Sequence, residues 1–455
     1  MSIRDKLNRS LGLENDAPTV EINVDVDEAG VPLDGVDLDG NPTPEVDEAE
    51  MLEAAAEIEA DDDDIEELEE AQATLESLQV LMIEDYQKGG MSPESARFAA
   101  IAVESISLKY GISAQEVGIS LESFSQDRNS ASIVSMEGVK DFISNIVRTI
   151  VEKIKELMKK IADFYQRNLS GAAGLKRRAE ALKKKARNTT GTKMKVNKLD
   201  DKGLFARLNI AGDAPNASKV VAAIKSLGIS VKAEFKEEDL ESTVKSVLTP
   251  SNYASEAAMD TAANEIKKDM GKFPNPSAGG SLSSSFEIGG TSTNSTAFTG
   301  SGGFPGNKAI GWGVSGNAAP NDITLISRIQ AGVFTDNPKL KSDKSIASPA
   351  LTLSECENIC DAVIDNMAIV INNAQKKKDG LKVIKVIEKA GNDIIRDIDE
   401  DATAEQRWAA KLLNTTTHVY RVIQSGQAQI AGYNMTLCKA GLSYAARSIN
   451  NFEKA

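Results

Sequence analysis

Apolar residues recur every three or four positions over several stretches of the chain, and this spacing predicts amphipathic helices. One stretch runs from Ile65 to Met82 and stops at a glycine pair. The next opens with Ser92-Pro93, a cap followed by the proline that favours a first helical turn, and it stops at Gly111. The sequence therefore predicts two consecutive helices in this part of the chain.

The longest apolar repeat starts after position 138 and predicts a helix of about seven turns. Its apolar members are Val139, Phe142, Ile143, Ile146, Ile150, Ile154, Leu157, Ile161 and Phe164. The other face carries Lys153, Lys155, Lys159 and Lys160. We expect the run Ser170-Gly171-Ala172-Ala173-Gly174 to break this helix.

Further helices are predicted near the C-terminus. Ser354 with Glu357, and Thr403 with Gln406, have the spacing of a capping box, in which each side chain satisfies a backbone N–H of the first turn. Apolar residues at helical spacing follow both pairs. We expect residues 351–455 to form an antiparallel helical bundle.

The pattern changes between the basic helix and this bundle. Short strands are predicted at 193–196, 205–210 and 229–235, and helices at 217–227 and 239–248. Together they predict a small α+β module over 193–274.

The next region, 275–350, is expected to be a flexible Gly/Ser-rich loop. Gly, Ser, Thr and Asn dominate residues 275–320, and such a composition offers no core. The predicted fold class is therefore mainly α with one small mixed module.

Charge divides the chain near position 138. Residues 1–137 hold 34 acidic and 7 basic residues, a net charge of −27, whereas 138–455 hold 34 acidic and 45 basic residues, a net charge of +11. Residues 138–199 alone hold 17 basic and 5 acidic residues, net +12. An acidic part joined to a basic part indicates a propeptide that masks a polyanion-binding product.

The acidic part is predicted to contain two regions. Residues 14–64 are dense in Asp and Glu, which repel one another and bury little apolar surface, so 1–64 is expected to be a disordered acidic tail. Residues 65–137 are expected to be a helical propeptide region. Its end, 112–136, is a Ser-rich connector whose backbone should be accessible to a protease.

A candidate cleavage site stands where the charge changes sign. The motif is Ser135-Met136-Glu137-Gly138, and the predicted cut follows Glu137. Glu122, which also follows a serine by two positions, is the next candidate.

The segment 138–192 also carries a dense group of cations. This basic cluster consists of Lys176, Arg177, Arg178, Lys183, Lys184, Lys185 and Arg187. Such residues neutralise phosphates without reading bases, so we expect non-specific binding of DNA or another polyanion. A solvated helix face is one alternative, and a basic amphipathic helix lying on an anionic membrane is another.

Few residues offer catalytic or metal chemistry. His418 is the single histidine, so a catalytic triad or a His-rich metal site lacks partners. Cys356 and Cys360 share a helix face and favour core packing in a reducing compartment. The run at 61–64 lacks the spaced ligands of a calcium loop. We predict no enzyme activity, no cofactor and no metal, and we find no signal core or membrane-spanning run.

The acidic N-terminal part, the glutamate at the charge boundary and the Lys-rich helix together resemble internal head proteins of large tailed bacteriophages. In those proteins the prohead protease removes an acidic propeptide after a glutamate. The resemblance covers about residues 65–190 and includes Thr74-Leu75-Glu76-Ser77-Leu78 and Ser120-Leu121-Glu122-Ser123-Phe124. Many such sites have Ile or Leu where this chain has Ser135, a departure that points to proteases of the giant-phage type.

The resemblance implies a structural virion protein of the head interior, assembled in the host cytoplasm and cut after Glu137. Its implied partners are the prohead protease, capsid or scaffold proteins, and packaged DNA, with the product either staying in the head or leaving with the genome. The alternative is a membrane-active protein in which 139–165 lies at a bilayer interface and the acidic part inhibits it. If the chain is instead a protein of the head interior, a membrane is not expected to be a partner.

Overall fold

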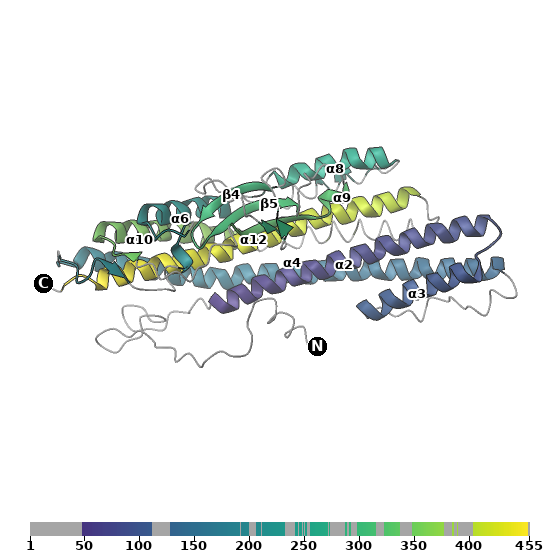
Figure 1. Ribbon diagram of the computed structural model, residues 1–455. Helices are drawn as coiled ribbons and strands as arrows, with labels where there is room; N and C mark the ends of the chain where they lie inside the picture. The colour runs from purple at the N-terminus through teal and green to yellow at the C-terminus, as the bar shows by residue number, and fades with distance from the viewer. Residues whose placement is uncertain are drawn as a thin grey trace. The chain divides into compact units, whose positions relative to one another are not determined.

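Most of the described chain is helical, in agreement with the predicted mainly α class (Figure 1). The computed structural model describes residues 48–111, 128–191, 193–199, 206–210, 212–232, 242–243, 245–247, 249, 251–252, 255–271, 273, 287–288, 291–292, 298–314, 323–336, 348–376, 385, 389 and 404–453. The described helices are α2 (Glu48–Gln87), α3 (Pro93–Tyr110), α4 (Arg128–Asn188), α6 (Ala217–Lys232), α8 (Glu256–Met270), α9 (Ile323–Ile326), α10 (Leu353–Lys376) and α12 (Ala404–Asn450).

Helix α2 begins at Glu48, well before the predicted start of this helix at Ile65. The expectation of disorder over 14–64 is therefore wrong for 48–64, and 14–47 lies outside the described residues. Ile58 and Ile65 flank the four consecutive aspartates and are buried. Their packing offsets the repulsion within the aspartate run, because burial of each such side chain contributes about 1.5–3 kcal/mol.

Helix α3 has the boundaries that its sequence predicts. The Ser92 side chain accepts a hydrogen bond of 3.0 Å from the backbone N–H of Ser95, and Pro93 is the first helical residue. Gly111 ends the helix in the left-handed region, with φ of 67°. Glycine adopts this conformation without steric cost.

Helix α4 is continuous over 61 residues. It begins within the predicted connector and continues through the break predicted at 170–174. The connector predicted at 112–136 is helical from Arg128 onward, while 112–127 lies outside the described residues. Gly171 and Gly174, in the predicted break, are buried within the helix. Packing of α4 against α2, α10 and α12 outweighs a helix-propensity cost of about 1 kcal/mol per glycine.

Helices α10 and α12 pack on α4 and on each other, and they supply the helices predicted for 351–455. The cap of α10 lies two residues earlier than predicted. The backbone N–H of Thr352 donates to Glu355 Oε2 at 2.8 Å, and the N–H of Glu355 donates to Thr352 Oγ1 at 3.2 Å. This reciprocal pair takes the role expected of Ser354 and Glu357, and Thr403 lies outside the described residues.

The region 193–274 is more helical than predicted. Helix α6 contains the expected helix at 217–227 but continues to Lys232, so the strand predicted at 229–235 is wrong over its described part. The strand predicted at 205–210 is also wrong, because 206–208 is helical. The buried residues of α6 keep a helical spacing that overrides the strand preference of its β-branched residues. The short strands β1 (Lys198–Leu199) and β7 (Ser348–Pro349) pair with each other.

The Gly/Ser-rich region, predicted to be a flexible loop, contains an antiparallel sheet. Its strands are β4 (Phe298–Phe304), β5 (Lys308–Val314) and β6 (Ile329–Thr335), in that order. A smaller antiparallel pair joins β2 (Glu287–Ile288) and β3 (Thr291–Ser292).

Glycines make this sheet possible. Gly300 and Gly311 face each other across β4 and β5, and a Cβ at Gly300 would lie 2.3 Å from the Ile310 carbonyl oxygen. On α12, a Cβ at Gly426 would lie 2.8 Å from the carbonyl oxygen of Ala331 in β6. The glycines within β4 and β5 remove the apolar alternation that identifies a strand, which is why the sequence predicted a loop.

Candidate functional site

Helix α2, from the acidic part of the chain, covers α4 and α12. It contacts both helices (Figure 1). The apolar α2 side chains that are at most 2% exposed are Ile58, Ile65, Leu68, Leu75 and Met82. At about 1.5–3 kcal/mol for each side chain, this burial contributes about 7–15 kcal/mol before opposing entropy is counted. The acidic part is therefore integrated into the core.

Carboxylates of α2 also pair with lysines of the basic helix. Asp61 Oδ2 lies 2.7 Å from Lys160 Nζ, and Asp64 Oδ2 lies 3.2 Å from Lys153 Nζ. The side-chain hydrogen bond to Asp61 raises the pKa of Lys160 above its usual value. Both pairs are partly exposed, so each contributes little to stability. Their effect is to neutralise cations of α4 with charges from the acidic part.

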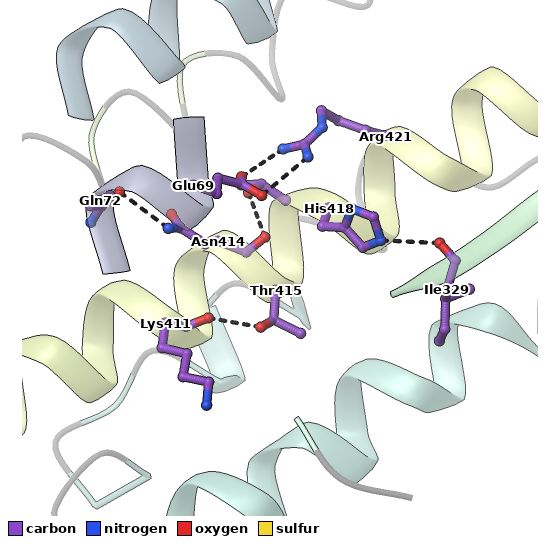
Figure 2. A network of polar contacts seen from close by, with 9 residues as sticks. Glu69, Gln72, Ile329, Lys411, Asn414, Thr415, His418 and Arg421 are labelled. Carbon is purple, nitrogen blue, oxygen red and sulfur yellow. Dashed lines mark hydrogen bonds and ion pairs between the residues drawn. The ribbon is translucent and has the colours of Figure 1, made fainter. Parts of the chain in front are cut away.

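A buried ion pair joins α2 to α12 (Figure 2). Arg421 Nη1 and Nη2 donate to the two carboxylate oxygens of Glu69 at 2.8 Å and 3.3 Å. The Arg421 side chain is 0% exposed and that of Glu69 is 11% exposed. Beside them Asn414 Nδ2 donates to Gln72 Oε1 at 3.2 Å. Loss of one partner of such a pair costs about 3–5 kcal/mol, because the other charge stays buried.

The polar network continues from α12 to the sheet. His418, one helical turn before Arg421, contacts the Ile329 carbonyl oxygen of β6 through Nε2 at 3.1 Å (Figure 2). Thr415 Oγ1 donates to the Lys411 carbonyl oxygen at 2.8 Å on the same helix. His418 therefore ties β6 to α12.

The predicted cleavage motif Ser135-Met136-Glu137-Gly138 lies inside α4, not in a connector. Gly138 and Val139 are buried. Peptide bonds in accessible, irregular backbone are the ones that proteases cut most readily. A cut after Glu137 in the folded chain would therefore require the first turns of α4 to open locally.

The structure does not bring the seven residues of the basic cluster into one free patch. Three of them bind other helices: Lys183 pairs with Asp361, Arg187 Nε lies 2.8 Å from Glu357 Oε2, and Lys185 Nζ donates to Asn450 Oδ1 at 2.9 Å. The hydrogen bond to Glu357 raises the pKa of Arg187. These contacts attach the end of α4 to α10 and α12.

The other cluster residues differ in their surroundings. Arg177 and Lys184 are exposed and lie seven positions apart, on one face of α4. Lys176 and Arg178 are partly buried.

The sequence did not single out Glu69 or Arg421, because Glu69 is one of many acidic residues. Arg421 carries one signal, a cation within the apolar repeat of α12.

Other candidate chemistry is limited in the described part of the chain. Cys356 and Cys360 are buried in the core, and burial raises the pKa of each thiol to about 12. Among the described residues, no three His, Cys, Asp or Glu side chains gather in a group that could hold a metal ion. Within the same residues, no helix is long and apolar enough to cross a membrane.

Comparison with known proteins assigns the chain to a family. A family model for phiKZ-like phage internal head proteins matches residues 44–447, on both sides of the cleavage motif. No curated protein and no solved structure matches the chain. The matched region contains all the long described helices, α2 included, apart from the last residues of α12. The chain therefore belongs to the family of phiKZ-like phage internal head proteins.

Proposed function

We propose that this structural protein of the head interior is made as a precursor and cut after Glu137 by the prohead protease. Its basic product then associates with packaged DNA, and either stays in the head or leaves with the genome. The observation that supports this most is the pairing of Asp61 and Asp64 in the acidic part with lysines of the basic helix.

The charge balance gives the cut a physical role. A net charge of −27 on residues 1–137 repels DNA and favours contact with basic capsid or scaffold surfaces during assembly in the host cytoplasm. A product of net charge +11 is attracted to the phosphate backbone. Removal of the acidic part therefore changes the sign of the protein's interaction with the genome.

Exposed cations are available for this contact. Arg177 and Lys184 of the basic cluster carry no ion pair among the residues that the structure describes, whereas Lys183, Lys185 and Arg187 hold helices together. Non-specific DNA binding needs many such charges and no fixed geometry. DNA contact through the exposed cluster residues leaves the helix contacts intact.

The membrane-active alternative receives no support from this fold. It needs the apolar face of 139–165, and the residues of that face from Val139 to Tyr165 are buried against neighbouring helices. We therefore do not propose it.

Substitution of the glutamate at the motif tests the proposal. In the phage, Glu137→Gln should block removal of the acidic part, because the protease no longer has a charged carboxylate to bind while the side-chain volume hardly changes. Immunoblotting of purified particles would then show the full-length chain. Glu122→Gln is the matched control and should be processed normally. Normal trimming of Glu137→Gln together with arrest of Glu122→Gln would move the site to Glu122.

A further inference from the structure

The surface of α4 and α12 that α2 covers is formed by side chains distant in sequence from their α2 partners. Asp61 contacts Lys160, and Glu69 contacts Arg421, 352 positions away. Contacts of this kind do not depend on the covalent link through 112–127. A cut after Glu137 removes none of the residues that make these contacts.

This α2-binding surface is defined by Lys153 and Lys160 of α4 and by Asn414 and Arg421 of α12. Its polar groups match α2 in order: Lys160 pairs with Asp61 and Lys153 with Asp64, so α2 runs antiparallel to α4. Further along α2, Glu69 reaches Arg421 and Gln72 reaches Asn414. The surface therefore distinguishes the direction and register of the helix that it holds.

The apolar side chains of α2 indicate which chemical class of ligand the α2-binding surface accepts. The α2 side chains Leu68 and Leu75, both 0% exposed, belong to one buried apolar cluster with residues of α4 and α12, so the surface is apolar beside its cations. A phosphodiester backbone offers negative charge but no apolar side chains for such a surface. An acidic helix with an apolar stripe offers both.

We infer that the α2-binding surface is a site for an acidic amphipathic helix, and that it retains α2 after the chain is cut. This inference rests on the proposed cleavage after Glu137. Cleavage there converts α2 from a covalent part of the chain into a bound ligand. Lys153, Lys160 and Arg421 then stay paired with α2, and the proposed contact with DNA follows only when α2 itself is cut or extracted.

An engineered cut tests retention without the phage protease. The recognition sequence of a site-specific protease is inserted within 112–127 of the full chain, the folded protein is cut, and the products are separated by size-exclusion chromatography without denaturant. We expect the two fragments to co-elute at micromolar concentration and moderate salt. Separation under these conditions would overturn the inference, while leaving the choice of Glu137 as the natural site unaffected.

Variants test whether the α2-binding surface recognises the Glu69 carboxylate. In the same cut protein, Glu69→Gln should weaken retention at least tenfold, measured by exchange with a labelled peptide of residues 48–87. Glu70→Gln is the matched control, because Glu70 is an exposed neighbour with the same chemistry, and it should exchange like the parent. Equal exchange of the two variants would contradict the recognition of Glu69. Displacement of the peptide by double-stranded DNA at stoichiometric concentration would identify the surface as a polyanion site instead.

Discussion

At the residue scale, Arg421 is a cation without exposed surface whose carboxylate lies in the part of the chain that is proposed to be removed. A buried guanidinium is tolerated when its hydrogen bonds are made and its charge is balanced. Glu69 supplies both through two parallel hydrogen bonds. The fold of the chain and the proposed retention of α2 therefore depend on the same pair.

Removing one partner should cost more than removing both. Glu69→Leu should lower the free energy of unfolding of the full chain by about 3–5 kcal/mol, because Arg421 stays buried without its carboxylate. Adding Arg421→Met should restore most of this loss, since an apolar pair of similar volume is tolerated there. Denaturant unfolding of the two single variants and the double variant measures the coupling, and additive losses would argue against a buried pair.

The buried thiols predict a loss of stability in alkali. Burial raises the pKa of Cys356 and Cys360 from 9.0 to about 12, so the folded state favours the neutral thiols. Their contribution is complete below pH 9 and is lost as the pH rises from about 9 to about 12, because the unfolded chain ionises first. Unfolding followed across this range should show a decline that is smaller in Cys356→Ala/Cys360→Ala. An equal decline in that variant would exclude the thiols as its cause.

At the element scale, sequence patterns identified helices better than they identified interruptions. The cap at Ser92 and the stop at Gly111 could be predicted because both act within one turn of backbone. The continuity of α4 through Gly171 and Gly174 could not, because it depends on packing against distant helices. The sheet was missed for a related reason, since Gly300 and Gly311 allow the backbones of β4 and β5 to approach closely and leave no apolar pattern.

The features of the candidate site also separate into those that a local sequence pattern shows and those that it does not show. The cleavage motif and the basic cluster were visible as a charge boundary and a run of cations. The Glu69–Arg421 pair was not, since no local pattern joins residues 352 positions apart.

The helical setting of the motif predicts that helix stability controls processing. Ser130→Ala with Ser132→Ala should slow the cut after Glu137, because each change raises helix propensity by about 0.5 kcal/mol at the start of α4. The matched pair Ser130→Gly with Ser132→Gly should accelerate it. The sum of about 1 kcal/mol corresponds to roughly a fivefold change in rate in each direction. Time courses with the purified protease measure both, and equal rates would show that α4 need not open.

At the scale of the whole molecule, two parts of opposite charge share one core. Residues 1–137 bring a net charge of −27, and α2 places part of it directly on the basic helix. The family match extends over both parts, from 44 to 447. The described chain from α2 to α12 is therefore one folded unit, and the proposed cut after Glu137 falls inside it.

The product freed of α2 should bind double-stranded DNA without sequence preference, and the full chain should bind far less. Arg177→Gln with Lys184→Gln should reduce the slope of log K against log salt by about 0.9 for each phosphate that is no longer neutralised, roughly 2 in total. Lys219→Gln with Lys225→Gln, exposed on α6 outside the basic cluster, is the control and should change the slope less. Titrations at several salt concentrations provide the slopes. Equal DNA binding by the product and the full chain would show that the acidic part does not control DNA binding.

The most direct test of the account is the N-terminus of this protein in mature particles. Mass spectrometry of purified virions should find a chain that begins at Gly138, with peptides throughout 138–455. Intact chains carrying residues 1–137 in those particles would contradict the account.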